Sequence, residues 1–126
     1  MSFIAADPER YVGRKVGNGH CVALVREAAN VPHASAWRRG QLVRGAVLAR
    51  GTAIATFTPG GKYGNHTDGR SHCALLDREL DHGLAVYDQW VGQPGHRRVI
   101  RWKSGAHPAV DDGDAYHVIE VDTEDD

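Results

Sequence analysis

Two cysteines and eight histidines are the residues of this sequence best suited to nucleophilic chemistry. Cys21 follows the glycine-rich turn of residues 17–19 and opens a segment whose apolar residues recur at helical spacing. At the start of a helix, unpaired backbone N–H groups and the positive end of the dipole favour a thiolate over a thiol. The same N–H groups could hold an oxyanion. Cys21 is therefore predicted to be a nucleophile, and the alternative is a small buried residue that faces the core.

A cysteine nucleophile needs a base, because a free thiol with a pKa of about 8.5 is only slightly ionised at neutral pH. Position favours His72, which begins a predicted strand after a glycine-rich loop and is followed by apolar residues that anchor that strand. His117 lies inside the last predicted strand and is expected to be a hydrogen-bonded structural residue. Five histidines fall in predicted loops or turns and are expected to be ordinary surface residues: His33, His66, His82, His96 and His107.

The third group of such a site orients the imidazole and fixes its tautomer, and it must come from a neighbouring element. Asp88 fits this role because it lies late in the predicted strand of residues 84–90, which follows the strand of His72. Gln89 points to the opposite face by the two-residue alternation of a strand and is the competing candidate. A surface ion pair is the other interpretation of Asp88.

Metal binding is the other chemistry that numerous histidines suggest. No His-x-His, Cys-x-x-Cys or His-Glu-x-x-His spacing occurs, so a zinc site would need ligands scattered over several elements. We therefore expect no metal site. Cys73 directly follows His72, and strand alternation turns its side chain to the other face, which predicts a core thiol. A Cys21–Cys73 disulfide is the alternative.

The elements that must position these residues follow from the order of helical and strand signals. Asp7 and Pro8 predict a short N-terminal helix, and residues 21–29 predict the helix of Cys21, which Pro32 ends. Residues 33–50 predict short helical or irregular pieces. Strands are predicted for residues 51–57, 71–77, 84–90, 97–102 and 115–121, and the loop of residues 58–70 is long enough to rim a cleft. The expected fold class is α+β, with N-terminal helices packed on a twisted antiparallel sheet of about five strands.

Length and composition fit a single packed domain over residues 1–121. The sequence has 126 residues, of which 41% are hydrophobic and 25% charged. The formal net charge is −1, from 15 basic and 16 acidic side chains, so no positive excess is available for a nucleic-acid partner. The short basic runs at residues 38–39 and 96–98 are expected to be solvated surface. Residues 122–126 predict a disordered acidic tail.

Neither a secretion signal nor a transmembrane segment is expected. The first residues lack the basic segment and the apolar run that a secretion signal needs. The apolar stretches are strand-sized, well short of the 18 or so residues that a membrane helix requires. A chain made in a reducing cytoplasm is expected to keep both cysteines as thiols.

With Cys21, His72 and Asp88 in this order, the sequence resembles the CHAP and NlpC-type peptidases, which are papain-like cell-wall hydrolases. More narrowly, residues 8–25, 51–57 and 87–90 resemble a compact bacterial family related to type VI secretion amidase effectors, and this similarity spans nearly the whole chain. The resemblance implies a papain-like fold of the NlpC type and carries over Cys21 as nucleophile, His72 as base and Asp88 as orienting residue. It also implies that His20, Gln89 and Trp90 contact the substrate.

The sequence departs from the pattern of these relatives at two places. Many relatives have glycine before the histidine and a small residue after it, whereas this chain has Ser71 and Cys73. Many CHAP enzymes have glutamine before the cysteine as an oxyanion donor, and this chain has His20 there. His20 is one candidate for that donor, and the backbone N–H of Cys21 alone is the other.

The resemblance further implies what the protein does. The expected substrate is a peptidoglycan stem peptide, whose amide bond is hydrolysed through a thioester acyl-enzyme without a cofactor. The expected setting is an antibacterial effector made in the bacterial cytoplasm without a signal peptide and delivered to the periplasm of a target cell by secretion machinery. A cognate immunity protein is the expected partner. The alternatives are an inactive wall-binding module of the same fold and a thiol-dependent acyltransferase.

Overall fold

The computed structural model describes residues 2–66, 70–105 and 108–121. His107 and the predicted tail of residues 122–126 lie outside the described residues. The described part contains a single α-helix, α1 (Cys21–Ala29), and short 3-10 helices at Pro8–Tyr11, Ala34–Ala36, Ala109–Asp111 and Gly113–Ala115. Its strands are β1 (Trp37–Leu42), β2 (Ala53–Thr56), β3 (Cys73–Leu80), β4 (Gly83–Trp90), β5 (Gln93–Arg101) and β6 (Tyr116–Val121).

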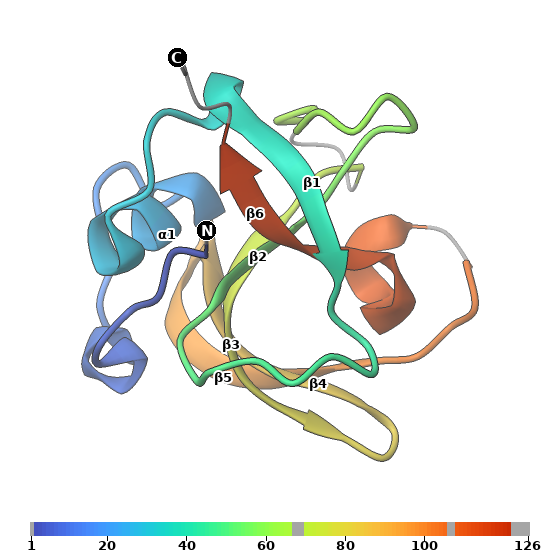
Figure 1. The fold of residues 1–126 in the computed structure, drawn as a ribbon. Helices are drawn as coiled ribbons and strands as arrows, with labels where there is room; N and C mark the ends of the chain where they lie inside the picture. The colour runs from blue at the N-terminus through green and yellow to red at the C-terminus, as the bar shows by residue number, and fades with distance from the viewer. Residues whose placement is uncertain (1, 67–69, 106–107, 122–126) are drawn as a thin grey trace.

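All six strands form one antiparallel sheet with the order β1-β6-β2-β3-β4-β5. The sheet is strongly curved, and α1 lies beside it on the left of Figure 1, packed on β3 and β4. The strands β3, β4 and β5 follow one another as hairpins, whereas β6 returns from the end of the chain to lie between β1 and β2. The predicted α+β class with an antiparallel sheet is confirmed.

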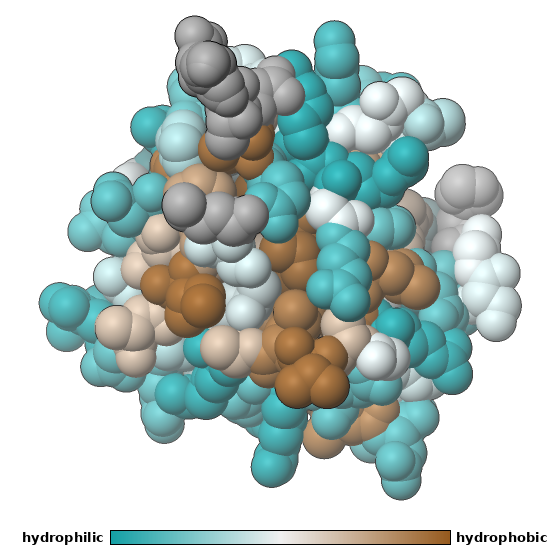
Figure 2. Space-filling view, in the orientation of Figure 1, coloured by the Kyte–Doolittle hydropathy of each residue, from teal (hydrophilic) through white to brown (hydrophobic). Residues whose placement is uncertain are grey.

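Both faces of the sheet are buried, and each has its own apolar core. The core on the α1 side includes Leu24, Val25, Trp37, Leu75, Tyr87 and Ile119. The core on the other side includes Ile54, Leu76, Leu84, Val86, Ile100 and Tyr116. On the outer surface, hydrophilic side chains predominate and apolar ones form small groups among them (Figure 2). β4 is buried from Gly83 to Gln89. Because side chains alternate along a strand, Asp88 and Gln89 point to opposite faces of the sheet, and both are buried there.

The helix α1 has the limits that the sequence predicts. Its first residue is Cys21, and Leu24, Val25 and Ala29 form its buried face. It ends at Asn30, which adopts the left-handed conformation (φ 57°), and Pro32 follows two residues later. Asparagine tolerates this conformation better than most side chains, and proline cannot continue a helix, so both residues define this end.

The segment of residues 33–50 corrects the sequence prediction. It contains a short 3-10 helix, as expected, but residues 37–42 form β1, and the sheet therefore has six strands instead of about five. β1 lies at the edge of the sheet, has β6 as its neighbouring strand and has a break in register between Arg39 and Leu42. A short edge strand with two arginines lacks the apolar alternation by which strands are recognised.

The strand β5 begins at Gln93, four residues before the predicted start at Arg97. The sequence Gln-Pro-Gly-His at residues 93–96 has the composition of a turn. β5 is the other edge strand of the sheet. Pro94 is tolerated there because the missing N–H can lie on the side that has no neighbouring strand. His96 therefore lies in a strand, and its prediction as an ordinary turn residue is wrong.

Candidate active site

Cys21 lies at the N-terminus of α1, beside a cleft of about 340 Å³. The cleft is lined by His20, Cys21, His66, Ser71, His72, Trp90, Val91, Arg98, Val110 and Asp111. The loop of residues 58–70 contributes His66 to its wall, so this loop does rim a cleft, as predicted. A larger groove of about 620 Å³ runs along the other side of α1 but includes neither Cys21 nor His72. We therefore take the smaller cleft as the candidate active site.

His72 is held at the start of β3 by backbone contacts with β2. Its N–H donates to Thr56 Oγ1 at 3.0 Å, and its carbonyl accepts from the Thr56 N–H at 3.0 Å. Its ring Nε2 lies 2.6 Å from Asp88 Oδ2. This contact leaves Nδ1 as the ring nitrogen that can face Cys21. The structure thus brings together the three residues that the sequence singled out from α1, β3 and β4.

The electrostatics of Cys21 and His72 favour an ion pair. Hydrogen bonds from Cys73 and His72 hold the pKa of Cys21 well below its ordinary value, although burial opposes this effect. Burial of the His72 ring lowers its pKa, but the hydrogen bonds to Asp88 and Cys21 outweigh burial and raise the pKa to about 9. At neutral pH the arrangement therefore favours a thiolate next to an imidazolium, which is the reactive state of a cysteine nucleophile.

Asp88 is fully buried and remains a carboxylate because cationic groups surround it. Its Oδ2 accepts from His72 Nε2 and, at 2.8 Å, from Arg98 Nε. His96 Nε2 lies 2.9 Å from the other oxygen, Oδ1, but the pair lacks the geometry of a hydrogen bond. Burial raises the pKa of Asp88, and the contacts with His72 and Arg98 outweigh this and lower it below its usual value.

Sequence reasoning missed the contributions of His96 and Arg98, both of which were expected to be solvated. In the β4–β5 pairing, His96 lies directly opposite Asp88, and Arg98 lies two residues further along the same face of β5. The Arg98 guanidinium also lies over the Trp90 ring, 5.1 Å from its centroid. Both residues could have been predicted from the register of the β4–β5 hairpin. That register follows once the two-residue turn at Val91 and Gly92 is recognised in the sequence.

Gln89 has a different role from the substrate contact that the resemblance implied. It is fully buried on the opposite face from Asp88. Its Oε1 accepts from the Val16 N–H at 3.0 Å, and its Nε2 donates to the carbonyls of Val16 (2.9 Å) and His20 (2.8 Å). Gln89 therefore fixes the turn that leads into Cys21. Its side chain reaches neither the His72 ring nor the cleft.

His20 and Trp90 lie where residues that contact a substrate would be needed. Both line the cleft together with Cys21 and His72, and Trp90 remains 42% exposed. The Trp90 ring packs edge-on against the rings of His72 and His96, with centroids 6.2 and 5.0 Å away. Their contact with a substrate stays a prediction.

The remaining neighbours of Cys21 come from the core. Cys73 is completely buried, as predicted, and both cysteines are free thiols. Burial, followed by contact with Cys21, raises the pKa of Cys73 well above its ordinary value, so Cys73 keeps its proton. The Tyr63 hydroxyl lies 3.7 Å from Cys21 Sγ. Tyr63 had no sequence signal, because it follows a Pro-Gly-Gly turn in what reads as a loop.

Within residues 2–66, 70–105 and 108–121, no group of three or more His, Cys, Asp or Glu side chains is arranged to bind a metal ion. Over the same residues, no helix has the length and apolar character needed to cross a membrane.

Comparison with known proteins agrees with this geometry. The family model described as domesticated amidase effector 2 matches residues 1–119. The chain belongs to this family. The domesticated amidase effector 2 of Ixodes scapularis is 36% identical over 125 residues, which cover 92% of this chain and 83% of that protein. The type VI secretion amidase effector 2 protein of Salmonella typhi is 42% identical over 89 residues, or 69% of this chain and 65% of that protein.

A solved structure supports the same relationship. The structure of a type 6 secretion amidase effector 2 superposes with a TM-score of 0.83 and 29% sequence identity, covering 96% of each chain. Family membership confirms the predicted resemblance to type VI secretion amidase effectors and the prediction of an amidase, and the superposition is consistent with the papain-like fold.

Proposed function

We propose that this protein is a cysteine-dependent amidase that hydrolyses amide bonds in the stem peptides of peptidoglycan. The observation that carries the proposal is the arrangement at the cleft, which Cys21 and His72 both line and where His72 Nε2 lies 2.6 Å from the buried Asp88. A thiolate, an imidazolium and a buried carboxylate are the groups that acyl transfer through cysteine requires. The printed names of the relatives, which are amidase effectors, support the same reaction class.

The reaction begins when the Cys21 thiolate attacks the carbonyl carbon of the scissile amide. The carbonyl oxygen becomes an oxyanion, and the candidates to stabilise it are the backbone N–H of Cys21, alone or together with the His20 side chain. His72 then gives its proton to the leaving nitrogen, the C–N bond breaks, and a thioester forms at Cys21.

Hydrolysis of the thioester returns the enzyme to its starting state. The neutral His72 takes a proton from water, and the hydroxide attacks the thioester carbonyl. Collapse breaks the C–S bond and releases a carboxylic acid, which loses its proton to solvent, and leaves the Cys21 thiolate beside a protonated His72. Asp88 keeps the imidazole oriented and stabilises its positive charge throughout.

The proposed setting follows from the type VI secretion effector named among the relatives. Peptidoglycan lies outside the inner membrane, so the protein would act after delivery into the periplasm of a target cell. The producing cell would then need an immunity protein, and the cleft beside Cys21 is the surface whose blockage would stop the reaction.

Expression with and without an added export signal tests this function. The exported protein should lyse a Gram-negative host, whereas the same protein without the signal should be tolerated. Exported Cys21→Ala and His72→Ala should be harmless at equal abundance, because the acyl-enzyme route needs both groups. His82→Ala, which changes an exposed histidine in the β3–β4 turn, should lyse like the wild type. Lysis by exported Cys21→Ala would instead support a wall-binding module.

A further inference from the structure

A buried tyrosine contacts the reactive sulfur from the side away from the cleft. The Tyr63 hydroxyl lies 3.7 Å from Cys21 Sγ, and Tyr63 is only 9% exposed. Tyr63 is absent from the residues that line the cleft, whereas Cys21 and His72 are both among them. His72 therefore approaches the sulfur at the cleft, and Tyr63 approaches it from the core.

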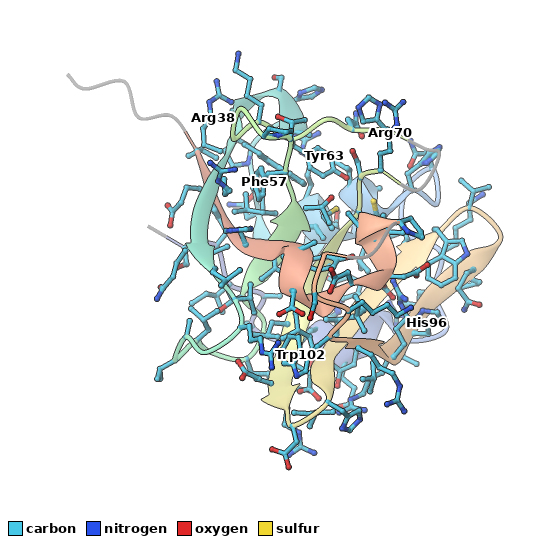
Figure 3. The ribbon with its side chains drawn as sticks, turned by 90° about the vertical axis from the view of Figure 1, so that its right-hand side faces the viewer. Arg38, Phe57, Tyr63, Arg70, His96 and Trp102 are labelled. Atoms are coloured by element: carbon cyan, nitrogen blue, oxygen red, sulfur yellow. The ribbon has the colours of Figure 1, made fainter. Side chains whose placement is uncertain are left out.

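The Tyr63 ring is fixed by two aromatic neighbours. Its centroid is 4.8 Å from that of Trp37 and 6.4 Å from that of Phe57, and Phe57 packs edge-on. Phe57 and Tyr63 lie close together below the loop that follows β2 (Figure 3). These contacts leave the hydroxyl little freedom to move away from the sulfur.

The backbone before Tyr63 is fixed as well. The Thr58 N–H donates to the Lys62 carbonyl at 2.8 Å, and the Gly61 N–H donates to the Thr58 carbonyl at 2.8 Å. The Arg39 N–H of β1 donates to the Gly61 carbonyl at 2.9 Å, which ties this turn to the sheet. Gly61 has a φ of 82°, a conformation that glycine adopts without strain. The Pro-Gly-Gly turn therefore positions Tyr63 next to the Cys21 sulfur.

The direction of the hydrogen bond follows from the chemistry of the two groups. Burial, together with the negative charge at Cys21, raises the pKa of Tyr63 above its ordinary value, so the phenol stays neutral. A thiolate has no proton to donate, so the phenol O–H must be the donor when Cys21 is ionised. When Cys21 is a neutral thiol or a thioester, its sulfur is a weak acceptor, so the hydrogen bond from Tyr63 is weaker than the bond to the thiolate.

We propose that Tyr63 is a further activating and positioning residue of this enzyme, whose hydroxyl donates a hydrogen bond to the Cys21 thiolate and holds Sγ toward the cleft. The same bond would assist release of the product, because charge returns to the sulfur as the thioester breaks. The consequence for turnover rests on the proposed function. The contact with the thiolate does not.

Tyr63→Phe tests the proposal, since phenylalanine keeps the ring contacts and removes only the hydroxyl. The probe is iodoacetamide, with alkylation of Cys21 followed across pH by peptide mass spectrometry. We expect the alkylation rate of Tyr63→Phe below neutral pH to fall about tenfold, because less thiolate is present. We expect kcat/KM on peptidoglycan fragments to fall about tenfold through kcat, with KM unchanged. Tyr87→Phe is the matched control, because its buried hydroxyl binds Arg50 at 3.0 Å instead of the sulfur, and it should alter neither rate.

A second substitution works in the opposite direction and leaves the shape of the site nearly unchanged. Replacing Tyr63 with 3-fluorotyrosine gives a more acidic phenol and a stronger donor, so Cys21 should alkylate faster at low pH than in the wild type. A residue that only packs would leave the alkylation profile unchanged in both variants, and that result would overturn the proposal. The failure of the proposed function looks different, since it would appear as wild-type turnover by Cys21→Ala.

Discussion

At the scale of single residues, the site is a line of alternating charges that runs from the cleft into the sheet. The lowered pKa of Cys21 and the raised pKa of His72 favour a thiolate next to an imidazolium, and His72 in turn contacts the buried Asp88 carboxylate. Arg98 and His96 lie behind Asp88, and the contact with Arg98 helps to keep it ionised. Each charge is stabilised by its neighbour, so Cys21 and His72 depend on Asp88, which is not among the residues that line the cleft.

The pH dependence of kcat/KM should reveal the Cys21–His72 pair. The active ion pair needs Cys21 deprotonated and His72 protonated. Because the pKa of Cys21 is lowered and that of His72 is raised to about 9, the pair exists between these two values. We expect a bell-shaped profile whose alkaline limb falls near pH 9, measured on soluble peptidoglycan fragments. An alkaline limb near pH 6.5, the ordinary value for histidine, would contradict the raised pKa of His72.

Two substitutions of Asp88 should separate orientation from charge. Asp88→Asn keeps an oxygen that can accept from His72 Nε2, but it cannot balance the imidazolium charge. Asp88→Ala removes the acceptor and leaves Arg98 and His72 without their shared partner. We expect Asp88→Ala to lower kcat by about 10²-fold or more and Asp88→Asn to lower it less. Wild-type turnover by either variant would show that another residue orients the imidazole.

At the scale of the elements, the end of β4 organises both sides of the site. Asp88 extends to His72 on one face, and Gln89 extends to the turn before α1 on the other. Two adjacent residues of one strand therefore fix the base and the approach to the nucleophile together. This division follows from the alternation of side chains along a strand that is buried on both faces.

Replacing Gln89 should change the position of Cys21 and the stability of the fold. Gln89→Ala removes three hydrogen bonds and takes away the Gln89 acceptor of the Val16 N–H, whereas the carbonyls of Val16 and His20 keep their bonds from the Gly19 and Ala23 N–H groups. We expect the free energy of unfolding to fall by about 2 kcal/mol or more and kcat to fall with it. Denaturant unfolding and turnover measure the two effects. Gln41→Ala, at an exposed glutamine of β1, is the control and should change neither.

The sequence signals were sufficient for elements with clear periodicity and failed for the edges of the sheet. The helix of Cys21 and the central strands have apolar patterns that indicate their type. β1 and the start of β5 are edge segments that contain arginine, proline or glycine, and their pairing depends on partners distant in the sequence. Missing the start of β5 also meant missing His96, because a residue placed in a turn has no cross-strand neighbour.

At the scale of the whole molecule, the site exists because the sheet brings distant segments to one end of α1. Cys21 and His72 are recognisable from the sequence as residue types at element starts, and the family resemblance supports Asp88. Tyr63 and Arg98 are not recognisable in this way, since their roles depend on how a turn packs on β1 and on the register of a hairpin. The positions of Tyr63 and Arg98 are therefore set by tertiary packing, which no local sequence pattern indicates.

The fold should make the two cysteines react differently. In the native protein, Cys21 is partly exposed with a lowered pKa, whereas Cys73 is completely buried with a raised pKa. We expect iodoacetamide to alkylate Cys21 far faster than Cys73 at neutral pH and to alkylate both at similar rates in denaturant. Mass spectrometry of the peptides gives both rates. Equal rates in the folded protein would contradict the activated nucleophile.

The most direct test of a cysteine-dependent amidase is the rate at which purified protein releases peptide from isolated peptidoglycan. The wild type should cleave an amide bond and release products that have gained one water. Cys21→Ala should lower this rate by about 10³-fold or more, while His82→Ala should keep it. The double variant Cys21→Ala with His72→Ala should be scarcely slower than either single variant, because the two groups act as one unit. Release by Cys21→Ala at a rate close to that of the wild type would contradict the proposal.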